Sequence, residues 1–312
     1  MEFKHIPVML NECLDGLNIK SNGIYFDGTL GGAGHSSAIL KKLTDGGLLI
    51  ATDKDDEALK IATKRLANIS NNFKTIKSDF KRFNQILDEL NIDKIDGVLL
   101  DLGVSSYQLD NAERGFSYIA DAPLDMRMDK SNPLTAEKVV NDYSAEKLTK
   151  IFYDYGEEPF TKKIVQNILE FRKNNKITTT KMLADIIKAS VPKKVQIEKG
   201  NPCKRVFQAI RIEVNGELSG LFETINKMIE RLKVGGRIAI LTFHSLEDRI
   251  VKDCFKENAT GCICPKNIPV CVCGHKASVK LINKKPIVAT DNELKNNSRS
   301  ASAKLRIAEK IC

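Results

Sequence analysis

A glycine-rich turn near the start of the sequence is the first feature that could do chemistry. It occupies residues 28–34, after the apolar run Gly23–Asp27 and before an amphipathic stretch that begins at Ser36. Glycines let the backbone take positive φ and approach a ligand closely, and the N-terminus of a following helix attracts negative charge. Dinucleotide-binding enzymes and ordinary tight turns share such a segment. The turn therefore predicts a ligand site only in combination with other residues.

Polar residues follow the next three apolar runs. The second run ends at Asp53, the third is followed by Asp79 and Phe80, and the fourth ends at Asp101. In an open parallel sheet a ligand binds beyond the carboxyl ends of the strands, so the pattern predicts a nucleoside-bearing cofactor. Asp53 could accept hydrogen bonds from both ribose hydroxyls or be a surface cap. Phe80 could seat an adenine or pack in the core.

The composition of the turn helps to choose between two cofactors that contain a nucleoside, NAD and S-adenosylmethionine. Residues 32–37 read Gly-Ala-Gly-His-Ser-Ser, which lacks the third glycine of the dinucleotide fingerprint. We also find no later segment that resembles a second mononucleotide-binding half. The sequence therefore favours S-adenosylmethionine over NAD.

The spacing of apolar residues predicts the elements that position these groups. Over the first hundred residues, short apolar runs alternate with amphipathic stretches, which is typical of βαβ units and a parallel sheet. The pattern stops at Tyr107, and helical periodicity extends from Leu134 to about Leu218. The alternation of helix and strand returns with an amphipathic helix, Leu221–Leu232, and an apolar strand, Arg237–Phe243. We expect an α/β fold with a doubly wound, mostly parallel sheet and an inserted small helical domain.

These changes of pattern divide the chain into three segments. We expect residues 1–107 to form the first part of the core, 108–215 the helical insertion, and 216–312 the second part of the core. A last amphipathic run, Ala303–Ile311, is expected to form a closing edge strand.

The positive charge of the chain is unevenly distributed. The formal net charge is +9, but residues 266–312 hold ten basic against three acidic residues, and residues 131–215 hold sixteen against ten. The remainder is therefore acidic. A basic insertion and a basic tail suit a polyanionic partner such as a nucleic acid, although basic surfaces also serve solubility.

The first residues and the hydropathy of the chain bear on its location. Residues 1–7 show no apolar stretch behind a basic start, and no apolar run approaches the length of a membrane span. We expect a cytoplasmic protein that contacts no membrane and has no obligate protein partner.

Four cysteines crowd into twelve residues of the tail. Cys262, Cys264, Cys271 and Cys273 lie close to His275, and this set suits structural zinc. However, zinc sites usually leave two or more residues between paired cysteines, and these pairs leave one. The alternative is a reduced, thiol-bearing loop near the nucleic acid, and we assign no metal from the sequence.

Five segments together resemble one known family. They are Gly31–Ser36, Asp101–Ser106, Pro123–Met128, Arg205–Asn215 and Phe243–Arg249. In their order across nearly the whole chain, they are similar to the motifs of the bacterial 16S ribosomal RNA (cytosine-N4)-methyltransferases. The resemblance implies a class I methyltransferase fold with an inserted helical domain. It also implies S-adenosyl-L-methionine as cofactor and 16S ribosomal RNA of the small ribosomal subunit as partner.

The resemblance implies particular cofactor-binding residues as well. In the family, these positions belong to the glycine-rich loop, the ribose-binding acid, the residue after the third strand and the fourth-strand motif. In this sequence they are Ala33, Gly34, His35, Asp53, Phe80, Asp101 and Gln108. Asp79 is our own addition from the pattern of strand ends.

The implied reaction requires a catalytic acceptor. The exocyclic amine of cytosine is a poor nucleophile because its lone pair is delocalised into the ring, so an enzyme must position and polarise it. Our hypothesis is that Asp101, or an acceptor in the turn at Ser105 and Ser106, hydrogen-bonds the amine and aligns it for attack. His244, after the strand 237–243, is the second catalytic candidate, although a histidine there could simply order the loop.

Candidates for the substrate side are fewer. Asp125, Arg127 and Arg249 could contact RNA, but Arg127 could instead pair with Asp125 or Asp129. Charge does not distinguish RNA from DNA, so a DNA cytosine-N4 methyltransferase is one alternative. A non-catalytic RNA-binding assembly factor is another, although its cofactor motifs would be expected to have degraded.

Overall fold

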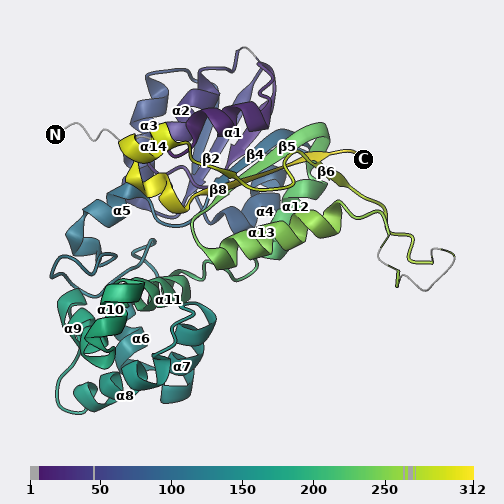
Figure 1. The fold of residues 1–312 in the computed structure, drawn as a ribbon. Coiled ribbons are helices and arrows are strands. Elements are labelled where there is room, and N and C mark those ends of the chain that lie inside the picture. Colours follow the sequence, from purple (N-terminus) through teal and green to yellow (C-terminus); the bar gives the residue numbers. More distant parts are fainter. Residues whose placement is uncertain (1–6, 45, 263, 266–269, 271) are drawn as a thin grey trace. The chain divides into compact units, whose positions relative to one another are not determined.

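The chain forms two compact units in the computed structural model, which describes residues 7–44, 46–262, 264–265, 270 and 272–312 (Figure 1). The first unit comprises residues 1–103 and 220–312, and the second comprises residues 104–219. The second unit starts four residues before, and ends four residues after, the expected insertion 108–215. The chain turns at Gly103, where φ is +92°, and Ser105 already caps the next helix, so the change of unit precedes Tyr107.

The first unit is built on one eight-stranded sheet. Its strands are β1 (Ile24–Asp27), β2 (Leu48–Asp53), β3 (Phe73–Lys77), β4 (Ile95–Asp101), β5 (Leu232–Thr242), β6 (Val279–Leu281), β7 (Ile287–Val288) and β8 (Lys304–Lys310). Strands β3, β2, β1, β4 and β5 lie in that order and are parallel. The order therefore reverses between β1 and β4, which is the switch point at which open α/β sheets bind ligands. The α/β fold expected from the sequence is confirmed.

The C-terminal strand differs from the sequence expectation. Strand β8 pairs antiparallel with β5 on one side and with β6 and β7 on the other, so it lies inside the sheet and is not its edge. The expectation was wrong because β6 and β7 span only three and two residues, too few to give a pattern of alternating hydrophobicity.

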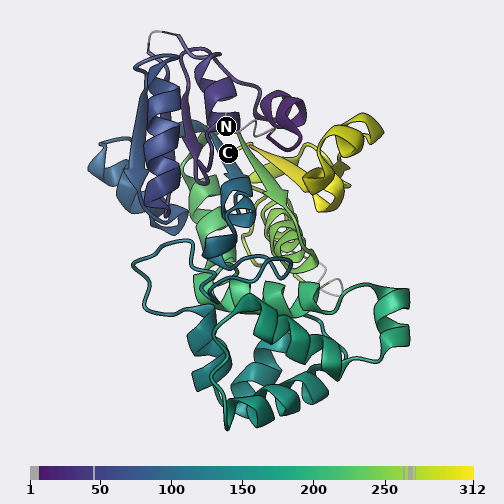
Figure 2. The same ribbon diagram turned by 90° about the vertical axis from the view of Figure 1, so that its left-hand side faces the viewer.

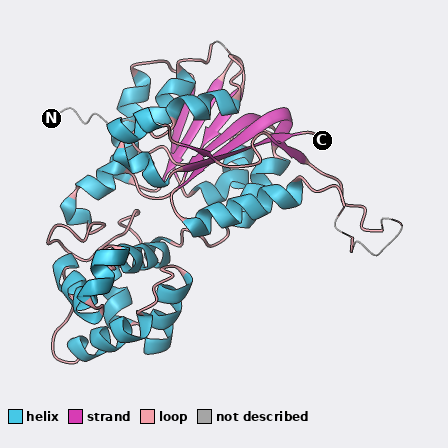
Figure 3. Cartoon of the chain, viewed as in Figure 1, coloured by secondary structure: helices cyan, strands magenta, loops and turns pink. Residues whose placement is uncertain are grey.

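Both faces of the sheet are covered by helices (Figure 3). One face packs on α1 (Leu10–Leu17), α2 (Gly34–Leu40) and α3 (Asp56–Ala67), and the other on α4 (Phe83–Glu89), α12 (Leu221–Glu230) and α13 (Ser245–Asn258). The short helix α14 (Asp291–Asn296) precedes β8. Adjacent strand residues alternate between the two cores, as Tyr25 and Phe26 do, because successive side chains point to opposite faces. Polar groups are therefore confined to the ends of the central strands.

The second unit is helical. Residues 104–219, all of which the structure describes, form helices, turns and loops without a strand (Figure 2). The helices are α5 (Ser106–Asp110), α6 (Ala136–Asp142), α7 (Ala145–Asp154), α8 (Thr161–Arg172), α9 (Thr180–Ser190), α10 (Lys193–Lys199) and α11 (Cys203–Asn215). Across the described part of both units, no helix combines the length and the apolar character needed to cross a membrane.

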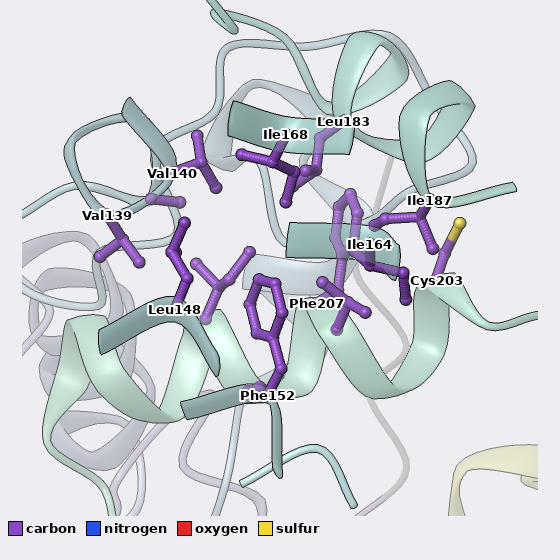
Figure 4. Packing of buried hydrophobic residues seen from close by; sticks show 14 of the residues in the cluster. Val139, Val140, Leu148, Phe152, Ile164, Ile168, Leu183, Ile187, Cys203 and Phe207 are labelled. Carbon is purple, nitrogen blue, oxygen red and sulfur yellow. The ribbon is translucent and has the colours of Figure 1, made fainter. Parts of the chain in front are cut away.

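The helical unit has its own hydrophobic core. Leu148 and Phe152 of α7, Ile164 and Ile168 of α8, and Phe207 of α11 point into one cluster (Figure 4). Phe152 is fully buried there, whereas the next residue, Tyr153, is 41% exposed on the other side of the helix. The unit therefore depends on packing among its own helices.

We predict that Phe152→Ala lowers the free energy of unfolding of this unit by about 3–5 kcal/mol, because it removes apolar contacts and leaves a cavity. Tyr153→Ala is the matched control and should change the value by about 0.5 kcal/mol or less. Urea denaturation followed by circular dichroism measures both. Equal destabilisation by the two changes would contradict the packing described here.

Candidate active site

The turn after β1 is held by the last residue of that strand. Asp27 is buried, and its carboxylate accepts hydrogen bonds from Ser36 Oγ at 2.6 Å and Thr29 N at 3.0 Å. Burial raises the pKa of this carboxyl, although both hydrogen bonds oppose the rise. Asp27 thus fixes the turn to the first turn of α2. We did not expect this role, although the signal that selected Asp53, an acid at a strand end, is present here too.

Close packing beneath the turn explains its first glycine. A Cβ atom at Gly28 would lie 2.4 Å from Leu100 Cδ2 and 2.8 Å from Phe80 Cβ, too close for any side chain. Phe80 itself is 9% exposed and packs in the core. Of the two interpretations from the sequence, the structure supports core packing, and a contact of Phe80 with an adenine stays a prediction.

The backbone of the turn then reverses before α2. Ala33 has a φ of +59°, a left-handed conformation that residues other than glycine seldom adopt, and Gly34 begins the helix. A Cβ at Gly34 would lie 2.9 Å from Pro7 Cβ. Ala33 and Gly34, both predicted to bind the cofactor, therefore lie where backbone conformation and close packing restrict the side chains that the chain can carry.

Asp53 closes this turn from β2. Its Oδ2 accepts a hydrogen bond from Gly31 N at 2.7 Å, and its Oδ1 accepts one from Asp55 N at 2.9 Å. Burial raises the pKa of Asp53 to about 6, although these two hydrogen bonds oppose the rise. The carboxylate therefore positions the glycine-rich turn and keeps lone pairs for other donors.

Asp101 lies at the end of β4 beside His35. Its Oδ2 is 3.6 Å from His35 Nδ1, and its backbone N donates to Thr29 Oγ1 at 2.6 Å. Its Oδ1 is buried and has no hydrogen-bond partner among the described residues. Burial raises the pKa of Asp101 to about 6, and the nearby Asp27 adds to the rise while His35 opposes it. Asp101 is therefore a carboxylate with an unusually high proton affinity and one oxygen ready to accept a hydrogen bond.

His35 connects this carboxylate to the N-terminal segment. Its ring is 5% exposed, and its Nε2 lies 2.9 Å from Val8 O, which can only accept. Nε2 therefore carries the ring proton in the neutral form, and Nδ1 faces Asp101. The predicted residues His35 and Asp101 are brought together.

His244 caps the helix that follows β5. Its Nδ1 accepts a hydrogen bond from Glu247 N at 3.4 Å, while Glu247 Oε2 accepts one from His244 N at 3.4 Å and another from Phe243 N at 2.9 Å. This reciprocal pair orders the loop and begins α13. The structural alternative for His244 is thus supported, and its catalytic role stays a prediction.

The remaining predicted residues make local contacts. Gln108, in the second unit, completes a capping box with Ser105 at the start of α5. Asp79 caps the short turn after β3 and pairs with Lys54 Nζ at 2.8 Å. Each therefore has a structural role of its own.

Arg127 pairs with Asp125 within the second unit. Its Nε and Nη2 donate to the two carboxylate oxygens, each at 2.8 Å. Burial alone would raise the pKa of Asp125, but the bidentate pair with Arg127 outweighs burial and lowers this pKa. The interpretation of Arg127 as an internal partner of Asp125 is confirmed.

The predicted residues of the first unit share one edge of the sheet. They follow or end successive parallel strands, so the carboxyl ends of β1 to β5 carry them all. They are Ala33, Gly34, His35, Asp53, Phe80, Asp101 and His244. Carboxylates, glycine turns and helix N-termini at such an edge are suited to binding a nucleoside.

Comparison with known proteins gives a match over nearly the whole chain. Residues 2–311 match the model of the MraW methylase family. Three proteins named ribosomal RNA small subunit methyltransferase H come from Lachnospira eligens, Clostridioides difficile and Clostridium botulinum strain Kyoto. They are 53%, 52% and 54% identical to this chain over 311 residues, covering 100% of it and 99%, 100% and 100% of the relatives.

We predict that His244→Ala lowers the free energy of unfolding by about 0.5–2 kcal/mol, since the first turn of α13 loses its cap. Asparagine is also a good cap, so His244→Asn should retain most of the stability. Thermal denaturation of the two variants measures the difference. If both lose the same stability, the cap is not what His244 contributes.

The raised pKa of Asp101 predicts an unusual pH dependence. When the pKa of a carboxyl is higher in the folded state than in the unfolded state, the ionised carboxylate destabilises the fold at any pH above both pKa values. Below both values the carboxyl is protonated in both states, and the effect disappears. Asp101→Asn should therefore raise the free energy of unfolding at pH 7.5 by about 1–3 kcal/mol, with the gain lost below about pH 4.

Asp96 provides a control of opposite sign. Burial alone would raise the pKa of Asp96, but the hydrogen bond from Lys233 outweighs burial and lowers this pKa. Asp96→Asn should therefore destabilise the fold at pH 7.5 and have less effect as the pH falls below the ordinary value. Urea denaturation across this range measures both variants, and the same sign for both would contradict the electrostatics described.

Proposed function

The chain belongs to the MraW methylase family, and from this premise we propose that it transfers the methyl group of S-adenosylmethionine to the N4 amine of a cytosine in 16S ribosomal RNA. The names of its relatives support a substrate in the RNA of the small ribosomal subunit. The observation that carries the proposal is Asp101, a carboxylate at the switch point of the sheet whose buried Oδ1 has no partner among the described residues.

The residues at this edge of the sheet fit the cofactor. Asp53 accepts two backbone hydrogen bonds, which leaves lone pairs for the two hydroxyls of a ribose. The glycine-rich turn allows close approach of a ligand to the backbone. When bound, S-adenosylmethionine supplies an activated methyl group on a positively charged sulfur. We propose that the residues holding it are Ala33, Gly34, His35, Asp53, Phe80, Asp101 and Gln108.

Asp101 positions and deprotonates the amine. Its Oδ1 accepts one N–H of the cytosine amine, which draws electron density toward the nitrogen and orients it for in-line attack. Transfer of the methyl group to this nitrogen would make the amine more acidic. Asp101 takes the proton that the amine loses, since a pKa of about 6 makes it a stronger base than an ordinary aspartate.

Two histidines support this arrangement in different ways. His35 is anchored to Val8 O and lies beside Oδ2 of Asp101, so its ring packs against that side of the carboxylate while Oδ1 is left for the substrate. His244 accepts a hydrogen bond from Glu247 N through Nδ1, which orders the loop after β5, while its buried Nε2 has no hydrogen-bond partner among the described residues. In this proposal Asp101 is the catalytic acceptor, and His244 is the second catalytic candidate.

The distribution of charge supports RNA as the partner. Residues 131–215 carry sixteen basic against ten acidic residues. Basic residues attract the phosphate backbone of a nucleic acid without regard to its sequence. We propose that this region binds the RNA and that the protein acts in the cytoplasm.

We predict that the purified chain labels a cytosine of 16S RNA when it is incubated with methyl-labelled S-adenosylmethionine and small ribosomal subunits or free RNA, and that it leaves duplex DNA unlabelled. Asp101→Ala should slow the transfer about 100-fold or more, the range of a general base. Mass spectrometry of the RNA nucleosides identifies the methylated atom.

The control variant is Asp56→Asn, since Asp56 lies in the first turn of α3 and pairs only with the exposed Lys77 in the contacts described. It should retain full activity. Labelling of DNA in preference to RNA would replace the proposal with a DNA methyltransferase. Unchanged transfer by Asp101→Ala would remove Asp101 from the mechanism.

A further inference from the structure

Three thiols converge in the first unit, away from the strand ends described above. They lie between the end of α13 at Asn258 and the start of β6 at Val279, in a segment without helix or strand among its described residues (Figure 3). The Sγ atoms of Cys262, Cys264 and Cys273 all lie within 4.8 Å of one another. This convergence is a feature that methyl transfer does not explain.

The distance between two of the sulfurs matches metal coordination. Cys262 Sγ and Cys273 Sγ are 3.8 Å apart. A zinc–sulfur bond is about 2.3 Å, so two thiolates of a tetrahedral zinc site are about 3.8 Å apart. A disulfide would bring the sulfurs to about 2.05 Å. The arrangement therefore has the dimensions of a thiolate–zinc site and not those of a disulfide.

The spacing of the cysteines had argued against zinc. One residue separates Cys262 from Cys264, whereas paired zinc ligands are usually separated by two or more residues that form a turn. In a regular strand, this spacing would place both thiols on one face without a turn between them. Here Cys262 and Cys264 both belong to the cluster, and neither lies in a strand. The short spacing is therefore compatible with a shared ion.

The composition of the segment restricts the metal. Residues 259–290 contain five lysines and no aspartate or glutamate. Magnesium and calcium prefer carboxylate oxygens, and residues 259–290 contain no carboxylate side chain. Thiolate ligands favour zinc. The lysines also offset the negative charge that several thiolates bring to one place.

We propose that Cys262, Cys264 and Cys273 bind a structural Zn²⁺ ion. Three thiolates leave one position of a tetrahedral site for a further ligand. Cys271 lies outside the described residues. The proposal concerns the three thiols and is independent of the methyl-transfer reaction.

A metal ion gives this loop an order that apolar packing does not provide. Val270 and Val272 are 71% and 77% exposed, so they contribute little to a core. Hydrogen bonds from Ser278 to Asn258, at 2.8 Å and 2.9 Å, close only the base of the loop. A zinc ion shared by Cys262 and Cys273 links two described residues that are eleven positions apart in the chain.

Metal analysis of the full chain, purified without chelator, tests the proposal. We expect about one zinc per chain, and Cys262→Ser and Cys273→Ser should each lower the zinc content about tenfold or more. Cys312→Ser is the matched control, because this exposed cysteine donates to Ala277 O and is outside the cluster. It should retain the metal.

A second measurement does not require that the variants fold. Replacement of zinc by Co²⁺ in the wild-type chain should give thiolate-to-cobalt charge-transfer absorption and the visible bands of a tetrahedral ion. Wild-type protein without zinc that also gives no such spectrum would overturn the proposal. So would zinc that stays bound in both cluster variants, or a disulfide between Cys262 and Cys273 in protein purified under reducing conditions.

Discussion

Three carboxylates crowd one edge of a parallel sheet, and the arrangement of the site depends on how the chain tolerates them. Asp27, Asp53 and Asp101 end three adjacent strands, and the charge of Asp27 adds to the burial that raises the pKa of the other two. Asp27 and Asp53 are held by donors from the glycine-rich turn and its neighbours. Asp101 has His35 on one oxygen and no described partner on the other. The least satisfied acid is thus the one best able to accept a hydrogen bond from a substrate.

Much of this edge could be predicted from the sequence. The central strands are buried on both faces and read as apolar runs, so the acids at their ends were visible as breaks in those runs. The role of Asp53 in holding the turn could not be seen, because it depends on Gly31 N, which lies 22 residues away. The pairing of His35 with Asp101 was equally hidden, since only the order of β1 and β4 in the sheet brings α2 beside β4.

Other features lacked any sequence signal of their own. The interior position of β8 depends on strands too short to show alternation. His244 is an unusual N-cap, and only the reciprocal contact with Glu247 shows its structural role. In the helical unit, periodicity predicted the helices, whereas the bidentate pair of Arg127 and Asp125 was one of two open interpretations until the geometry was seen. Local patterns therefore predicted elements better than they predicted partners.

The adjacency of β4 and β5 has a consequence for the kinetics of folding. These strands pair with Asp101 opposite Leu241, although the whole unit Val104–Ser219 intervenes in the chain. Loop-closure entropy grows only with the logarithm of loop length, so the intervening unit adds little to the thermodynamic cost of this pairing. Contacts between distant residues nevertheless slow the approach to the native state. The stability of the central sheet thus depends little on the size of the insertion. The rate at which β4 and β5 pair depends on how early the inserted helices become compact.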